Sequence, residues 1–413
     1  MMARTYVRTA DADPQHSGQF QTKQTYEGNN LMEKTHVAEG VCSLPEIQAE
    51  LAGKRKRIQH LIEELRLDAI LISRHENIAW MSAGIVDVRV GLLKETGVAS
   101  LLITKDDRAF YLTTNNEAPR LAEEEFSQLD YQPLVQPWYA NEVQSSIESV
   151  VGNGAVGADV PIAGMRAVSL QYLRFQLTAT EVERYRWLGR HIASVATTVL
   201  LQLRPGMNEK TIQARLAEHL ISLDILPSVF LDAVDKRIGE FRHPVPRSGV
   251  LKQFGMIGFC ARRWGLSASI TRFVHFGRMP KELEDRFAAV ADVNARLQAA
   301  TVEGASADML FEIARAAYAS LGYSGEETMH HQGGATGYLE REWVARPGGS
   351  ERVTTPQAFA WNANLQGAKV EDTVLVQAGS NRSIELLTST PDLPTVVTRF
   401  DGVNYYSAGV LTG

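Results

Sequence analysis

Apolar positions recur at helical spacing where the first structured part of the chain begins. Ser43 and Glu46 fit a capping box, a serine followed three positions later by a glutamate at the start of a helix. The apolar residues that follow lie on one helix face: Ile47, Leu51, Ile58, Leu61, Ile62 and Leu65. Short apolar runs then predict three buried strands, at 69–72, 99–104 and 109–112. Because helices alternate with strands, we expect an α/β domain over residues 43–175.

The pattern changes in the second part of the chain. Three helical stretches come first, near 181–184, 190–203 and 208–223. Strand-like runs dominate beyond them, at 250–260, 267–276, 357–363 and 368–378. A single helical segment, 280–322, interrupts these strands. Helices grouped with an antiparallel-looking sheet predict an α+β domain over residues 176–413.

Residues 1–42 show no periodicity and are rich in Gln, Thr, Asn, Gly and His. Such a segment has too few apolar residues to bury. We interpret it as a flexible N-terminal extension, or as an arm that orders on a partner subunit.

Composition sets further limits. A chain of 413 residues is long for one domain, and 44% hydrophobic residues support a large core. The net charge of −6 argues against a nucleic-acid partner, since nucleic-acid binders carry a basic face. The densest basic run, Lys54–Arg57, has Glu63 and Glu64 nearby, so we expect a solvated helix face there.

The chain has two cysteines, Cys42 and Cys260. Two cysteines exclude a disulfide framework and a thiolate metal site, and they suit a reducing compartment. No apolar run approaches the roughly 18 residues of a membrane span, and the polar N-terminus lacks the apolar core of a secretory signal. The expectation is a cytoplasmic protein with no membrane partner.

Four stretches, in order along the chain, resemble the creatinase/aminopeptidase P/prolidase family, peptidase family M24. They are Arg74–Gly84, Leu203–Glu209, Ser269–Phe273 and Gly367–Val376. The resemblance runs from about residue 46 to the end of the chain. It implies a smaller creatinase-like α/β N-terminal domain followed by a catalytic domain with the pita-bread fold.

The metallopeptidases of this family hold two divalent ions with Asp, Asp, His, Glu and Glu. Counted from Thr271–Arg272, the corresponding positions hold Gly258, Ser269, His330, Asn362 and Glu371. Three of the five are residues that cannot hold a divalent ion at such a site. The resemblance therefore implies a member without the dinuclear site, and we expect neither a metal nor another cofactor.

Creatinase, a member that works without metal, is locally more similar. Its general-base histidine corresponds to His243, its carboxylate-binding arginine to Arg341 and a substrate-binding glutamate to Glu371. We predict His243, Glu371 and His330 as catalytic residues. The substrate-binding candidates are Arg341, Asn362, His331, Thr271, Tyr338 and Arg89, the last by analogy with an arginine that reaches a neighbouring subunit's site.

The residue types suit C–N bond cleavage. An imidazole is neutral near pH 7 and can take a proton from water, while a guanidinium grips a carboxylate through two parallel bonds. Each residue also has a structural interpretation: His243 precedes Pro244 and could shape a turn, and Arg341 could pair with Glu340 or Glu342. Thr271 stands where creatinase has a second glutamate, so creatine itself is a doubtful substrate.

The resulting hypothesis is a metal-independent, creatinase-like hydrolase that cleaves an amide, lactam or amidine C–N bond of a small carboxylate-bearing molecule. By resemblance we expect a homodimer in which one subunit's N-terminal domain closes the other's cleft. Two alternatives remain open: a lyase or ring-opening enzyme that uses the same pocket, and a non-catalytic pita-bread binding module. A functional dinuclear metallopeptidase is not expected.

Overall fold

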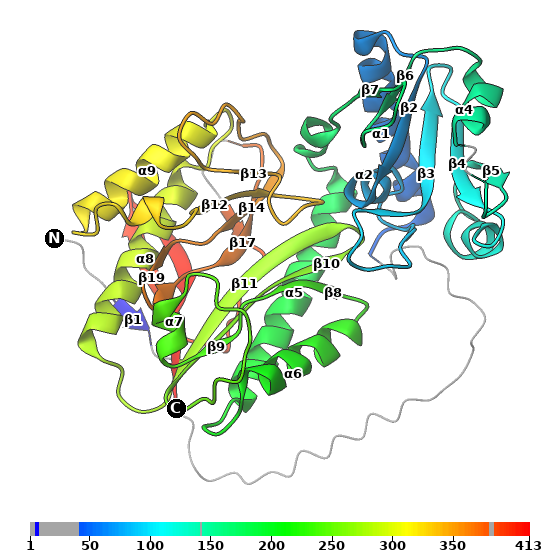
Figure 1. Ribbon diagram of the computed structural model, residues 1–413. Coiled ribbons are helices and arrows are strands. Elements are labelled where there is room, and N and C mark those ends of the chain that lie inside the picture. The colour runs from blue at the N-terminus through cyan, green and yellow to red at the C-terminus, as the bar shows by residue number, and fades with distance from the viewer. Residues whose placement is uncertain (1–4, 8–40, 141–142, 380–383) are drawn as a thin grey trace.

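The computed structural model describes residues 5–7, 41–140, 143–379 and 384–413, and the chain forms two domains (Figure 1). The N-terminal domain has a six-stranded mixed sheet in the order β5-β4-β3-β2-β6-β7. Its strands are β2 Ala69–Arg74, β3 Thr96–Thr104, β4 Ala109–Thr114, β5 Gln132–Gln136, β6 Val156–Ala158 and β7 Arg166–Ala167. Its helices are α1 Leu44–Leu65, α2 His75–Met81, α3 Ala118–Arg120, η1 Leu121–Glu125, α4 Val143–Val151 and η2 Gln171–Arg174.

The predicted start of α1 is confirmed. The backbone N–H of Ser43 donates to the Glu46 carboxylate at 2.7 Å, which satisfies a donor that the first helical turn leaves free. Arg66 ends the helix in the left-handed region, with φ 54°. The three predicted strands are also present, as β2, β3 and β4.

The C-terminal domain is α+β, as predicted, and contains two main sheets. One has the order β21-β11-β10-β8 with β9 also paired to β10, and the other has the order β13-β12-β14-β17-β18. The first sheet contains β8 Leu226–Phe230, β9 Ala233–Val234, β10 Phe254–Arg263, β11 Leu266–His275 and β21 Val410–Thr412. The second contains β12 Gly333–Thr336, β13 Trp343–Val344, β14 Gln357–Trp361, β17 Asp372–Val376 and β18 Ile384–Leu386. The sheets meet where Thr271 forms an antiparallel bridge with Glu371.

Helices cover both sides of these sheets (Figure 1). They are α5 Ala179–Gln202, α6 Glu209–Ile221, α7 Lys236–Glu240, α8 Lys281–Ala300, α9 Ala307–Ser320 and η3 Glu326–Thr328. Two predictions are corrected here. The stretches near 181–184 and 190–203 form one continuous helix, α5. Gly189 lies between them but does not end the helix; a Cβ there would lie 2.4 Å from the carbonyl oxygen of Leu387, so the glycine allows a close approach. The segment 280–322 is two helices, because Gly304 adopts φ 84° and Ser306 caps α9.

Short strands complete the fold. β15 Asn364–Leu365 pairs with β16 Ala368–Lys369, and β19 Thr395–Phe400 pairs with β20 Val403–Ala408. Within the predicted extension, β1 Thr5–Val7 pairs antiparallel with β19 of the same chain. The rest of residues 1–40 lies outside the described residues. No helix in the described part of the chain has the length and apolarity to cross a membrane.

The tip of the β10–β11 hairpin packs against the N-terminal domain. Trp264 and Gly265 form its two-residue turn with φ of 52° and 77°, values that suit a hairpin whose strands twist normally. A Cβ on Gly84 would lie 2.1 Å from the carbonyl oxygen of Trp264, so a glycine is needed for this approach. The strands β10 and β11 therefore run from the domain interface to the site described below.

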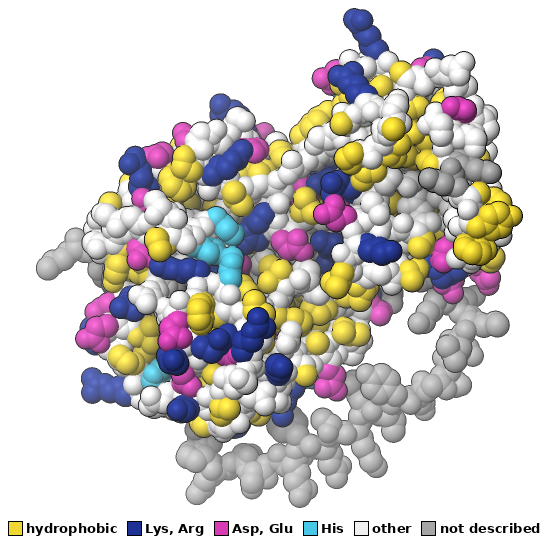
Figure 2. Space-filling model, viewed as in Figure 1, with side chains coloured by type: hydrophobic (Ala, Val, Ile, Leu, Met, Phe, Trp, Pro, Cys, Tyr) yellow, Lys and Arg dark blue, Asp and Glu magenta, His cyan; other side chains and the backbone are white. Residues whose placement is uncertain are grey.

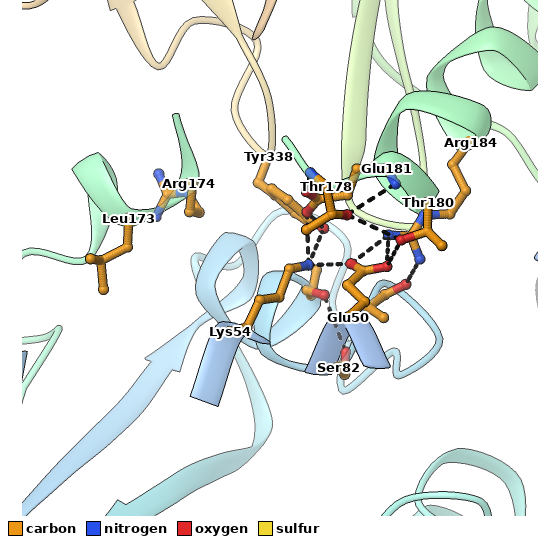
Figure 3. Close-up of polar contacts among 12 residues, drawn as sticks. Glu50, Lys54, Ser82, Leu173, Arg174, Thr178, Thr180, Glu181, Arg184 and Tyr338 are labelled. Atoms are coloured by element: carbon orange, nitrogen blue, oxygen red, sulfur yellow. Dashed lines mark hydrogen bonds and ion pairs between the residues drawn. The ribbon is translucent and has the colours of Figure 1, made fainter. Parts of the chain in front are cut away.

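A buried ionic network joins the domains (Figure 3). From α1, Glu50 pairs with Arg184 of α5 at 2.6 Å, and Lys54 pairs with Glu181 at 2.7 Å and also with Glu50. The hydroxyl of Tyr338 donates to Glu181 at 2.6 Å. Lys54 and Arg184 are 0% exposed. The prediction of a solvated face at Lys54–Arg57 is therefore wrong at Lys54. Two buried carboxylates neutralise the charge of Lys54: Glu50, one turn earlier on the same helix, and Glu181, far along the chain.

Candidate functional site

Three histidines from two loops lie together on the C-terminal domain. His243 follows α7, while His330 and His331 precede β12. One ligand-type atom of each lies within 4.8 Å of the others, and the Nε2 atoms of His243 and His330 are 2.7 Å apart. Figure 2 shows a group of histidine side chains on the face of this domain, close to lysine and arginine side chains. The structure thus brings together all three histidines that the sequence singled out.

The proton positions follow from the partners. His330 Nδ1 lies 2.5 Å from the carbonyl oxygen of His331, which can only accept, and 3.0 Å from Asn364 Nδ2, which can only donate. We assign the proton to Nδ1, because the contact with the carbonyl oxygen is the shorter of the two. The His330 Nε2 lone pair then accepts the N–H of His243 Nε2. In this arrangement His243 Nδ1 has the free lone pair.

The surroundings keep these imidazoles neutral. Burial, and then the charge of neighbouring His331, lower the pKa of His330 to about 3. Burial and Arg341 lower the pKa of His331 to about 4. Partial desolvation lowers the pKa of His243, although its side chain is exposed at the surface; Lys369 and Arg341 lower this pKa further, and Glu371 opposes them. His243 therefore lies within the electrostatic influence of both Arg341 and Glu371.

The carboxylate of Glu371 lies at the junction of the two sheets and is 4% exposed. Its Oε1 pairs with Arg341 Nη2 at 3.2 Å, and its Oε2 pairs with Lys369 Nζ at 2.7 Å. Thr271 Oγ1 donates to Oε2 at 2.6 Å. Burial alone would raise the pKa of Glu371, but Lys369 and Arg341 lower it to about 2. Both carboxylate oxygens are therefore charged and already paired.

These contacts change two predicted roles. Thr271 is 1% exposed and bonds Glu371, so it holds the carboxylate and does not face a substrate. Tyr338 is 0% exposed, and its hydroxyl belongs to the interdomain network, so its prediction as a substrate-binding residue is wrong. The physical reason in both positions is a nearby buried charge that takes the hydroxyl as its partner.

Arg341 lies between two strands of the site. Its Nη1 donates to Ser269 Oγ on β11 at 3.2 Å, its Nη2 reaches Glu371, and its Nε is buried with no partner. The carboxylates of the two predicted partners pair elsewhere, Glu340 with Arg262 and Glu342 with Arg174 at 2.6 Å. Arg341 Nη1 instead donates to the backbone carbonyl oxygen of Glu340 at 2.6 Å. The Arg341 side chain is 14% exposed, so an anion can use the unpartnered Nε–H only when the guanidinium turns toward the solvent.

The loop that carries Arg341 is fixed at both ends. Tyr338 is held by Glu181 and Lys54, and Glu342 is held by the buried Arg174 and accepts the backbone N–H of Tyr338 at 3.0 Å. The interdomain network therefore sets the position of the guanidinium.

A cleft of about 320 Å³ lies next to Lys369, and its lining does not include the three histidines, Arg341 or Glu371. Its polar lining includes Arg242, Asn364 and Lys369. Asn364 Nδ2 lies 3.0 Å from His330 Nδ1, and Arg242 donates to Asn364 Oδ1 at 2.7 Å.

Asn362, a predicted lining residue, is 2% exposed and its Oδ1 has no partner. Trp361 stacks on Phe359 and is part of the core.

Arg89 makes none of these contacts. It lies in the N-terminal domain and pairs with Asp87 at 2.7 Å. Its proposed reach into a neighbouring subunit stays a prediction.

Lys369 is the site residue that the sequence interpretation missed. It is 9% exposed, lines the cleft and pairs with Glu371. A signal was present, because residues two apart in an extended segment face the same way, and Lys369 stands two before Glu371.

Two family models match the sequence. The model of metallopeptidase family M24 matches residues 183–378, and the model of the creatinase/prolidase N-terminal domain matches residues 54–184. None of the curated proteins matches the chain.

Solved structures share the fold. The Xaa-Pro dipeptidase from Bacillus anthracis is similar with a TM-score of 0.66 and 17% identity, over 88% of this chain and 100% of that one. The prolidase from Pyrococcus horikoshii OT3 has a TM-score of 0.67 and 16% identity, over 82% and 98%. The N-terminal domain of the FACT complex subunit SPT16 from Cicer arietinum (chickpea) has a TM-score of 0.60 and 11% identity, over 84% and 97%.

Proposed function

Since the chain belongs to metallopeptidase family M24 and carries the creatinase/prolidase N-terminal domain, we propose that it is a hydrolase that works without the family's pair of metal ions. It cleaves a C–N bond, in an amide, lactam or amidine, of a small carboxylate-bearing molecule. The observation that carries this proposal is the guanidinium of Arg341, which lies between Ser269 and Glu371, two positions where the family has metal ligands.

The residues at the family's metal positions do not fit two divalent ions. Gly258 and Ser269 offer no carboxylate, and Glu371 already pairs with two cations. Asp232 bonds the N–H of Gly258 at 3.3 Å but is 0% exposed, and burial raises its pKa well above the usual range. Over the described residues, no group of three metal-ligating side chains includes an acid. Arg341 and Lys369 supply positive charge in place of the ions.

In the proposed reaction, His243 Nδ1 takes a proton from a water molecule, whose oxygen attacks the carbon of the C–N bond. The imidazolium then returns that proton to the leaving nitrogen as the bond breaks. His330 holds the ring of His243 by accepting its other N–H. Arg341 turns its partly exposed guanidinium to bind the substrate carboxylate and positions the reacting carbon beside the base. Glu371 acts as a positioning residue, because it fixes Arg341 and Lys369.

Arg341→Met should raise KM for a carboxylate-bearing substrate by about 10–100-fold, the loss expected for a charge-assisted hydrogen bond of about 1.5–3 kcal/mol. Arg341→Lys should recover only part of the loss, because an ammonium cannot reproduce the planar fork. Steady-state kinetics measure the effect. The matched control is Arg346→Met, an arginine paired with Glu351 at the surface. An unchanged KM in Arg341→Met would exclude its carboxylate-binding role.

The direct test of the proposal is a panel of amides, lactams and amidines, each with and without a carboxylate, incubated with the full chain and followed by mass spectrometry. Water-added cleavage products are expected from the carboxylate-bearing compounds. Cleavage of Xaa-Pro dipeptides only after added metal would contradict the proposal.

A binding module remains the second candidate, favoured by the shared fold with the SPT16 domain. It predicts no turnover of any compound in the panel and retention of a protein partner. An eliminated or ring-opened product without added water would point to a lyase instead.

A further inference from the structure

The three histidines have a geometry that hydrolysis alone does not require. Of the described residues, His243, His330 and His331 are the one group of three whose ligand-type atoms could meet at one metal ion. His330 is shared with the family's metal positions, whereas the two other ligand atoms come from residues outside that set. The group is therefore a different site.

The spacing of two ring nitrogens suits a single ion. Imidazole nitrogens bind Zn²⁺ at about 2.0–2.1 Å, so two of them at tetrahedral or octahedral angles are separated by about 3 Å. The Nε2 atoms of His243 and His330 are 2.7 Å apart and face each other. An ion can take the place of the proton that now lies between them.

Two further observations point to a ligand. Metal-binding histidines usually donate their second ring N–H to a carbonyl or carboxylate, and His330 Nδ1 makes such a contact with the carbonyl oxygen of His331. His331 Nδ1 is buried and has no hydrogen-bond partner. A buried polar atom without a partner is costly, and turning the ring toward an ion would satisfy one of its nitrogens.

We propose that His243, His330 and His331 bind one divalent transition-metal ion and that this ion switches off the hydrolase. Imidazole ligands suit Zn²⁺, Cu²⁺ and Ni²⁺, whereas Mg²⁺ and Ca²⁺ need oxygen ligands that the group lacks. Binding moves the proton of His243 from Nε2 to Nδ1, and no proton is gained or lost at this ring. Because Nδ1 is the proposed base, the metal-bound form cannot accept the proton of water. The inhibition rests on the proposed function, whereas the binding does not.

The test uses Co²⁺ as the probe, because its visible absorption reports nitrogen ligands without any substrate. Metal-stripped full-length protein is titrated with Co²⁺, and then Co²⁺ is displaced by Zn²⁺. One ion per chain is expected. His331→Ala and His330→Gln should each weaken Co²⁺ binding by more than about 10-fold, since they remove ligands and even outer-shell changes cost that much. His60→Ala, an exposed histidine on α1, is the control and should bind as the parent does.

The outcomes separate the two claims. Equal Co²⁺ binding by the parent and by both ligand variants overturns the metal site, whatever the turnover. Two ions per chain that are lost in Glu371→Gln would indicate the family's dinuclear site and overturn both proposals. Half-inhibition of hydrolysis by Zn²⁺ at its measured dissociation constant supports the switch. Stoichiometric Zn²⁺ binding with unchanged or higher turnover overturns the switch and removes His243 as the base.

Discussion

His243→Ala should lower kcat by about 10²–10⁴-fold, the usual contribution of a positioned general base. Alanine leaves no group to take the proton from water, whereas Glu371 still holds Arg341 and Lys369, and Arg341 still binds the substrate. KM should therefore change much less than kcat. The side chain of His243 is exposed, so its removal should leave the fold intact.

The measurement is steady-state kinetics on the substrate found with the panel, together with circular dichroism and thermal unfolding of the variant. His60→Ala serves as the matched exposed histidine. Turnover within twofold of the parent in His243→Ala would eliminate the proposed base. Loss of turnover accompanied by a lower unfolding temperature would assign His243 to stability.

Lys54→Met should destabilise the chain by about 3–5 kcal/mol, since it removes one partner from a buried charge network. Glu181 would keep the Tyr338 hydroxyl and the backbone N–H of Thr178 but no cation. Glu50 would keep Arg184 and Thr180. Denaturant unfolding measures this effect. Lys56→Met, two residues along the same helix but exposed, is the control and should change stability by less than about 0.5 kcal/mol.

The Lys54→Met substitution should also alter substrate binding at the candidate site. Tyr338 fixes one end of the loop that carries Arg341, so a loosened network should displace the guanidinium. KM should rise in Lys54→Met under conditions where the protein is still folded. Stability equal to that of Lys56→Met would show that the network does not hold the domains.

Much of the fold was predictable because periodicity is a local signal. The helix after Ser43 and the strands β2, β3 and β4 follow from capping and from apolar runs a few residues long. The burial of Lys54 was not predictable in this way. Its partner Glu181 is far along the chain, and a basic run in sequence normally indicates solvent.

In the candidate site, too, local motifs were predictive and long-range contacts were not. His243, His330 and His331 come together as expected, and so do Arg341 and Glu371, because aligned motifs carry residue identity. A motif does not indicate which hydrogen-bond or ion-pair partner a side chain takes in the fold. Thr271 and Tyr338 were interpreted as substrate-facing but bond buried charges, and no pattern indicated that Arg341 would occupy the space beside Ser269.

The central claim is that fixed cationic side chains and one imidazole do the work of the family's two ions. The most direct measurement is the turnover of the full chain, after chelation and dialysis, with its metal content quantified in the same sample. We expect full turnover, or a modest increase, in protein that holds no metal. Turnover lost on chelation and restored by Mn²⁺ or Zn²⁺ at two ions per chain would contradict the account.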